Sequence, residues 1–312
     1  MKANARHFSS HRPGSALLAV LWLIAILSMA AMVTLRVVSF DMEVATMQVH
    51  GFEARQMAET GLAIGCNPNI RRNDPLLHYV ADNGDSYDVR IVPEGARFNM
   101  NAILLRGDKS LLNSIFTSWG LSVDDSNMVT DSLSDWISTT GAVSANGAGA
   151  DWYLAQGRFN QPFNRPFYNL DEIRLVRGMD LVEAVRPDWR NWFTIWSSGK
   201  LDANEAEAEL IAAAAEVPVA DAQMIPDQVR GPDGIRDTDD DVPFQKIADV
   251  LALLKVDTSI RPDILARFTL NDPAVRVESI GQSGGAKRKI SLILRNRTGV
   301  PAVIERIEEI IP

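Results

Sequence analysis

Residues 16–35 read ALLAVLWLIAILSMAAMVTL, twenty consecutive positions without a charged side chain. As an α-helix this stretch spans roughly 30 Å, which is the thickness of the hydrocarbon core of a bilayer. Lys2, Arg6 and Arg12 precede it, and Arg36 follows it directly. Because the flank that is richer in Lys and Arg stays on the cytoplasmic side, the three preceding residues predict one membrane-spanning helix with its N-terminus inside and the body of the chain outside.

The helical pattern continues beyond the apolar stretch. Apolar and small residues recur at steps of three and four, which is the spacing of one helix face: Phe40, Val44, Met47, Gly51, Ala54, Ala58 and Leu62. No proline occurs between Ser15 and Asn67. We therefore predict one continuous helix over residues 15–66, which would be roughly 75 Å long.

The rest of the chain is acidic and poor in catalytic side chains. The 312 residues carry a net charge of −9, and without the three basic residues of the first fourteen positions, 28 basic residues face 40 acidic ones, or −12. This balance disfavours nucleic acid as a partner, because binding to phosphate depends on Lys and Arg. Outside the N-terminal segment only His50 and His78 remain for histidine catalysis or a zinc site.

Strand patterns occur at two distant places in the chain. Residues 87–92 alternate before Pro93, and residues 275–280 and 287–295 flank the glycine-rich segment 281–285. This segment, GQSGG, also fits the G-x-S-x-G pattern of hydrolases. That catalytic motif requires a helix after the turn. Because a second strand pattern follows here, we interpret the segment as the turn of a hairpin.

These patterns together predict an α+β fold with a division along the chain. A small antiparallel sheet, formed by residues 67–102 and 271–300, is expected to pack on the long helix. Residues 103–270 have mainly helical patterns and are predicted to form a large α-helical domain inserted into the sheet domain.

The N-terminus resembles the class III signal of type IV pilins and pseudopilins. A basic leader, residues 1–14, ends in glycine and joins the apolar helix directly, whereas an ordinary secretory signal has a shorter apolar region followed by a cleavage site. The resemblance implies that prepilin peptidase cuts between Gly14 and Ser15 and that the new amine is methylated. A plain single-span anchor is the alternative for this segment.

One position departs from the pilin pattern. Pilins and most pseudopilins carry glutamate at the fifth mature position, which is Ala19 in this chain. A carboxylate in lipid is costly unless it is paired, and the pilin glutamate is thought to pair with the amine of the subunit above it. A subunit with nothing above it needs no such pair, so alanine here is typical of a subunit at the tip of the fibre.

Segments along nearly the whole chain resemble, in order, the protein K family of minor pseudopilins in type II secretion systems. They are residues 15–23, 54–62, 96–102, 164–167, 171–179, 199–206 and 277–281. The resemblance implies a non-enzymatic subunit in the bacterial inner membrane, with its body in the periplasm. The implied partners are other minor pseudopilins, prepilin peptidase and the inner-membrane secretion platform, and also secreted substrates and the outer-membrane secretin.

Three other functions remain as alternatives to the protein K interpretation. A minor pilin of a type IV pilus would share the N-terminal segment. A membrane-anchored periplasmic enzyme would need a catalytic constellation, and a DNA-uptake protein would need a basic groove. The sequence offers neither of these two features, and the internal segments favour protein K over the pilin.

Two acidic regions are candidates for calcium, which prefers six to eight oxygen ligands, several of them from carboxylates. The first, within residues 231–243, holds Asp233, Asp237, Asp239, Asp240 and Asp241. Its alternative is a solvated acidic loop, because the EF-hand spacing and closing glutamate are absent.

The second acidic region contains Asp135 and Asp151. The resemblance implies a calcium cluster here, but Ser138, Thr140, Gly149 and Ala150 replace acids that are common in the family. We therefore predict that any bound calcium lies in the first region.

We expect the mature protein to begin at Ser15, because the basic leader joins the apolar helix directly at Gly14. The measurement is the intact mass of membrane-extracted protein from a strain with active prepilin peptidase. A mass that still includes residues 1–14 would contradict the assignment. Gly14→Ala should reduce processing, since the resemblance implies that the peptidase accepts a very small residue at this position.

Overall fold

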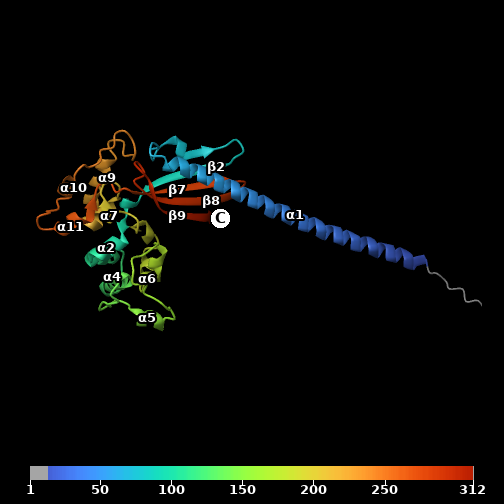
Figure 1. Ribbon diagram of the computed structural model, residues 1–312, viewed down its shortest axis with the longest axis horizontal. Coiled ribbons are helices and arrows are strands. Elements are labelled where there is room, and N and C mark those ends of the chain that lie inside the picture. Colours follow the sequence, from blue (N-terminus) through green and yellow to red (C-terminus); the bar gives the residue numbers. More distant parts are fainter. Residues whose placement is uncertain (1–12, 312) are drawn as a thin grey trace, which may run out of the picture.

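The computed structural model describes residues 13–311, so residues 1–12 of the predicted leader and Pro312 lie outside the described residues. Its longest element is α1 (Pro13–Cys66), a helix of 54 residues whose N-terminal part extends away from the rest of the molecule (Figure 1). This confirms the predicted continuous helix. Gly14 and Ser15 lie in its first turn.

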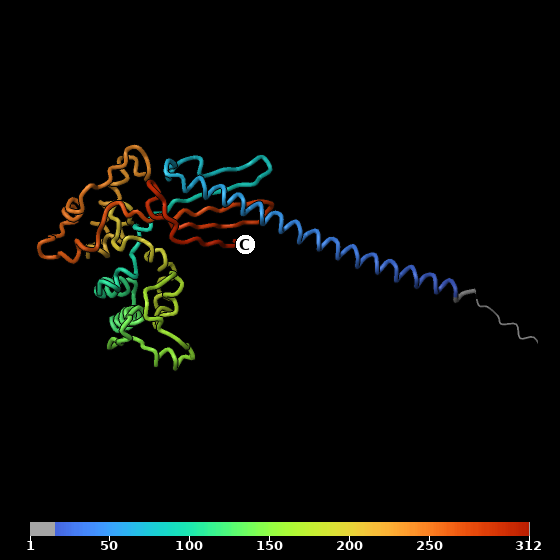
Figure 2. Tube along the Cα trace, in the orientation of Figure 1, coloured from blue at the N-terminus to red at the C-terminus, as the bar shows by residue number. Residues whose placement is uncertain are grey.

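A five-stranded antiparallel sheet packs on the C-terminal part of α1. Its strands, in spatial order, are β1 (His78–Val80), β2 (Ser86–Pro93), β7 (Ala274–Ser283), β8 (Ala286–Arg295) and β9 (Ala302–Ile311). The pairing of β2 with β7 brings two distant parts of the chain side by side (Figure 2). The α+β fold is confirmed, although the sequence analysis did not predict β1 or β9.

The glycine-rich segment 281–285 combines the end of a strand with a two-residue turn. Ser283 pairs with Ala286, and Gly284 and Gly285 between them have φ angles of 51° and 87°. Positive φ at both central positions is the conformation that a tight hairpin requires and that glycine adopts at low cost. The prediction of a hairpin turn is therefore confirmed, with Gly281 itself inside β7.

Alternating residues of the strands form a core with one face of α1. Tyr87, Val89 and Ile91 of β2 are buried, as are Val277, Ile290 and Leu294 of the neighbouring strands, and they pack against Ala58 and Leu62 of α1. Full burial of each large aliphatic side chain stabilises the fold by about 1.5–3 kcal/mol.

Small residues allow α1 to approach the sheet closely. A Cβ atom added to Gly281 of β7 would lie 2.0 Å from the carbonyl oxygen of Ala54 and 2.3 Å from the amide nitrogen of Ala58. On the helix side, a Cβ at Gly65 would lie 2.6 Å from a methyl carbon of Val277. Glycine on both surfaces therefore sets the distance between helix and sheet.

The chain between β2 and β7 is mainly helical and has its own hydrophobic core. Its α-helices are α2 (Met100–Arg106), α3 (Lys109–Ser118), α4 (Val123–Ile137), α5 (Ala150–Ala155), α6 (Met179–Val185), α7 (Ala208–Ala215), α8 (Val219–Ala222), α9 (Met224–Val229), α10 (Ile247–Leu253) and α11 (Pro262–Arg267). We call this part of the chain the helical region. In Figure 1 it lies at the end of the sheet that is remote from the free part of α1.

Short elements complete the structure. The 3-10 helices are η1 (Pro75–Leu77), η2 (Glu94–Ala96), η3 (Asp171–Leu175) and η4 (Trp189–Asn191). Two parallel strand pairs join β3 (Phe98–Asn99) to β4 (Phe193–Thr194) and β5 (Leu201–Asp202) to β6 (Phe268–Thr269). The pairs align Phe98 with Phe193 and Leu201 with Phe268, so each joins segments that are distant in the sequence.

We expect Gly281→Ala to lower the free energy of unfolding by about 2–3 kcal/mol, because the added methyl group meets the backbone of α1, which cannot rotate away. Chemical unfolding of the detergent-solubilised chain measures this change. Gly299→Ala is the matched control, since its nearest neighbour would be 3.8 Å away. Equal stability of the two variants would show that the close contact between α1 and β7 is not a constraint.

Candidate functional site

The N-terminal part of α1 presents an exposed surface that is free of charged side chains from Ala16 to Leu35. Every side chain from Ala16 to Val49 is exposed. Within the described part of the chain, Ala16–Cys66 is the one helix that is long and apolar enough to cross a membrane. The hydroxyl of Thr34 donates to the carbonyl of Ala30 at 2.9 Å, so this polar group is satisfied within the helix. The surface suits lipid or other apolar helices.

The predicted processing and assembly residues lie at the start of this surface. Gly14 and Ser15 belong to the first turn of α1, and Ala19 is exposed about one turn further on. Cleavage at Gly14, and the meaning of alanine at position 19, therefore stay predictions.

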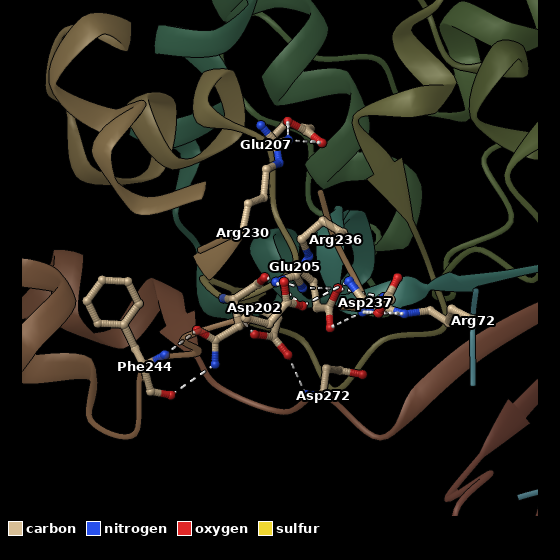
Figure 3. Close-up of polar contacts among 11 residues, drawn as sticks. Arg72, Asp202, Glu205, Glu207, Arg230, Arg236, Asp237, Phe244 and Asp272 are labelled. Atoms are coloured by element: carbon tan, nitrogen blue, oxygen red, sulfur yellow. Dashed lines mark hydrogen bonds and ion pairs between the residues drawn. The ribbon is translucent and has the colours of Figure 1, made fainter. Parts of the chain in front are cut away.

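The acidic loop, residues 231–243, is held by two arginines that follow α1, of which Figure 3 shows Arg72 beside Asp237. The Asp237 carboxylate accepts a hydrogen bond from Nε of Arg72 at 2.7 Å, and Asp239 accepts one from Arg71 at 2.9 Å. Both arginines lie more than 160 residues away in the sequence. Two of the five aspartates thus pair with arginines outside the loop, and Asp241 lies 3.8 Å from Arg236 within it.

The other three aspartates of the acidic loop bind groups of the loop itself. Asp240 accepts hydrogen bonds from the Thr238 hydroxyl at 2.6 Å and from the amide of Asp233 at 3.1 Å. These two bonds lower the pKa of the Asp240 carboxyl. Asp241 accepts from the amide of Asp237 at 2.9 Å, and Asp233 accepts from the amide of Ile235 at 2.7 Å. The carboxylates therefore stabilise a turn in the chain.

This arrangement does not gather the five carboxylates around one point. Over residues 13–311, no group of three or more His, Cys, Asp or Glu side chains is placed to hold a metal ion. The aspartates as they lie here fit arginine and backbone amides rather than the six to eight oxygens of a calcium site. Calcium binding by this loop stays a prediction.

Asp135 and Asp151 are not brought together. Asp135 is buried at the end of α4, where it accepts hydrogen bonds from the amide and hydroxyl of Ser144 at 3.0 and 2.7 Å. A Cβ at Gly147 would lie 1.7 Å from an Asp135 oxygen, so glycine leaves room for this contact. Asp151 is exposed in the first turn of α5. In this structure Asp135 shapes the loop between α4 and α5.

A network of ion pairs beside the acidic loop was not predicted from the sequence (Figure 3). Glu205 accepts hydrogen bonds from Arg72 at 2.7 Å and from Arg236 at 3.0 Å, and all three side chains are about three-quarters buried. Burial alone would lower the pKa of the Arg72 guanidinium, but Glu205 and Asp237 raise it above its usual value. The network ties the segment after α1 to the helical region.

A second unpredicted contact centres on Glu94, whose side chain is completely buried. Its carboxylate accepts hydrogen bonds from Arg97 at 2.6 Å, from Arg276 of β7 at 2.9 Å, and from the Thr194 hydroxyl of β4. Removing one partner from a buried ion pair costs about 3–5 kcal/mol, because the remaining charge stays buried. Glu94 therefore joins the sheet to the helical region.

Asp202 lies at the same junction with 1% of its surface exposed. Burial, together with the nearby Glu205 and Asp272 carboxylates, raises its pKa to about 6. The amides of Asp272 and Asn204, which donate to Asp202 at 2.6 and 3.0 Å, act in the opposite direction. No local sequence pattern marks Asp202, because its neighbours meet only in the folded chain.

Comparisons with known proteins find a family model and solved structures that are similar to this chain. Residues 96–187 match the family model described as "Type II secretion system (T2SS), protein K". A chain in the crystal structure of the GspK-GspI-GspJ complex from the enterotoxigenic Escherichia coli Type 2 Secretion System has a similar fold, with a TM-score of 0.63 and 14% sequence identity. The similarity covers 87% of this chain and 99% of that chain. No curated protein matches the chain in sequence.

We expect wild-type protein to lose stability relative to Asp202→Asn as the pH rises from 4 to 7. The Asp202 carboxyl ionises near pH 4 when unfolded and at about 6 when folded, so the folded state holds the extra proton in this window and stability falls as pH increases. A difference of about two pH units corresponds to roughly 3 kcal/mol.

Chemical unfolding of both proteins across this pH range gives the two slopes. The slope difference is the readout, because any constant loss from the asparagine side chain cancels. Parallel slopes would mean that Asp202 titrates normally in the folded protein.

Proposed function

We propose that this chain is a minor pseudopilin of the type II secretion system protein K family and that it occupies the tip of the pseudopilus. There it begins the fibre and helps the export of folded proteins across the outer membrane. The observation that carries this proposal is the half of α1 from Ala16 to Val49, whose side chains are all exposed.

The uncharged part of this surface, residues 16–35, requires a non-aqueous environment. Before assembly the lipid bilayer supplies it, with the N-terminus in the cytoplasm and the sheet and helical region in the periplasm. After assembly the α1 helices of neighbouring subunits supply it by close packing. One surface therefore serves first as the inner-membrane anchor and then as the core of a fibre.

The tip position is supported by Ala19. A subunit within a fibre of this kind has another subunit above it, whose amine can pair with a carboxylate at the fifth mature position. Here that position is Ala19, whose methyl side chain needs no charged partner in an apolar environment. This arrangement suits the first subunit of a fibre, processed after Gly14 and methylated on Ser15.

The proposed partners follow from this position. The similar crystal structure is of a complex of GspK with GspI and GspJ, and we assign this chain the corresponding partners, two other minor pseudopilins. Prepilin peptidase and the inner-membrane platform would act on it before and during assembly. The helical region lies at the far end of the sheet from the membrane helix (Figure 1), where secreted substrates and the secretin would meet it.

The alternatives are less well supported. The match of residues 96–187 to protein K favours type II secretion over a type IV pilus. The protein K family is structural. The aspartates of the acidic loop accept hydrogen bonds from arginine and backbone amides, so we propose no enzymatic role. The net charge of −9 argues against DNA uptake.

We expect Ala19→Glu to reduce secretion, because a subunit at the tip would place this carboxylate in an apolar setting without an amine above it. An unpaired charge there costs several kcal/mol or forces protonation. The measurement is export of a native substrate by cells that carry the variant at normal abundance. Ala19→Gln is the matched control for size. Wild-type secretion by Ala19→Glu would show that this position says nothing about the tip.

A further inference from the structure

The last strand, β9, forms an open edge of the large sheet. It pairs with β8 on one side, and no other strand in residues 13–311 lies on its second side. The register is regular from Glu305 opposite Ile293 to Ile311 opposite Lys287, with the one irregularity before Glu305. The regular part of this edge, from Glu305 to Ile311, is a template for a further strand.

This strand contributes nothing to the hydrophobic core. No residue of β9 is buried, whereas Ile290 and Leu294 of the neighbouring β8 are. Its aliphatic side chains are exposed instead: Val303 by 62%, Ile304 by 42%, Ile307 by 37% and Ile310 by 75%. Because side chains alternate along a strand, these apolar groups lie on both faces of the edge strand, where an added strand would cover part of each face.

Ion pairs and the ladder to β8 hold β9 in place. Arg306 pairs with Glu59 of α1, and Glu308 pairs with Arg55 of α1 at 3.0 Å. These contacts fix the strand in an extended conformation beside α1. The edge is therefore ordered before any partner arrives, which lowers the conformational entropy cost of binding.

The hairpin turn determines which backbone groups of β9 are free. In a two-residue hairpin the flanking pair, Ser283 and Ala286, is hydrogen-bonded, so alternate residues of β8 starting from Ala286 point to β7. The residues between them point to β9, where Ser291 lies opposite Ile307. By this alternation, the backbone groups of Arg306, Glu308 and Ile310 point to the open edge.

We propose that this edge of β9 pairs with an extended strand of a different pseudopilin subunit, an inference that rests on the proposed function. Free N–H and C=O groups in a row at strand spacing are satisfied by another strand. A helix cannot satisfy them, because its own backbone groups are already paired internally. The exposed aliphatic side chains then pack against alternate side chains of the added strand.

Charge favours a different subunit over a second copy of this chain. β9 carries three glutamates and one arginine. Pairing two β9 strands would bring six glutamates together against two arginines, and like charges on facing strands are destabilising. Glu305 has no cation within 4 Å among the described residues. The strand that fits this edge is therefore apolar and carries Lys or Arg.

Two variants at one position distinguish the contribution of the backbone N–H to binding from that of the side chain. Glu308→Ala and Glu308→Pro both remove the ion pair with Arg55, but only proline removes the N–H that points to the open edge. Proline is tolerated on edge strands where the N–H does not bond within the sheet. Thermal unfolding of both full-length variants verifies that they fold.

The measurement is co-purification in detergent of each full-length variant with the GspI- and GspJ-type pseudopilins of the same organism. We expect Glu308→Ala to bind within about threefold of wild type and Glu308→Pro to bind at least about tenfold more weakly, since an edge hydrogen bond is lost and the added strand meets the proline ring. If Glu308→Pro unfolds, Ile310→Pro is compared with Ile310→Ala in the same way.

Three other outcomes of the co-purification would overturn the proposal, and each has a different meaning. Equal binding by the proline and alanine variants would exclude the β9 edge as the contact while leaving the pseudopilin function intact. Wild-type protein that binds neither pseudopilin would remove the proposed function as well. Self-association of wild-type chain that is lost in Glu308→Pro would show that the edge takes a second copy instead.

Discussion

The close contact between α1 and β7 is the constraint on which the rest of the structure depends. Gly281 brings the strand against the backbone of Ala54 and Ala58, and that contact buries the C-terminal part of the helix. The sheet is much shorter than α1, so the part from Ala16 to Val49 has nothing to pack against in this chain (Figure 1). One helix thus becomes both a component of the folded body and a surface for assembly.

Ion pairs formed by arginines fix the helical region to the sheet. Glu94 binds Arg276 of β7, and Glu205 binds Arg72 in the segment after α1. Because these pairs are largely buried, each depends on its partner to offset the cost of desolvation. The acidic loop joins the same network through Asp237, and this pairing offsets part of the repulsion among its aspartates.

Local patterns allowed the sequence to predict α1 and the β7–β8 hairpin, since helix periodicity and a pair of glycines act over neighbouring residues. The pairing of the acidic loop with arginine could not be predicted, because Arg72 lies 165 residues from Asp237 and no local sequence pattern indicates the contact. β9 was missed for a different reason. It adds no side chain to the core, so it lacks the alternation of buried and exposed residues that marks a half-buried strand.

The central claim, that this chain forms the tip of a pseudopilus, is tested most directly by locating it in assembled fibres. Gold label attached to the helical region of the full-length chain can be imaged by electron microscopy in fibres assembled with the other pseudopilins. The account predicts label at one end of each fibre, while the same label on the major subunit decorates the whole length. Label on this chain along the fibre, or its absence from fibres, would contradict the account.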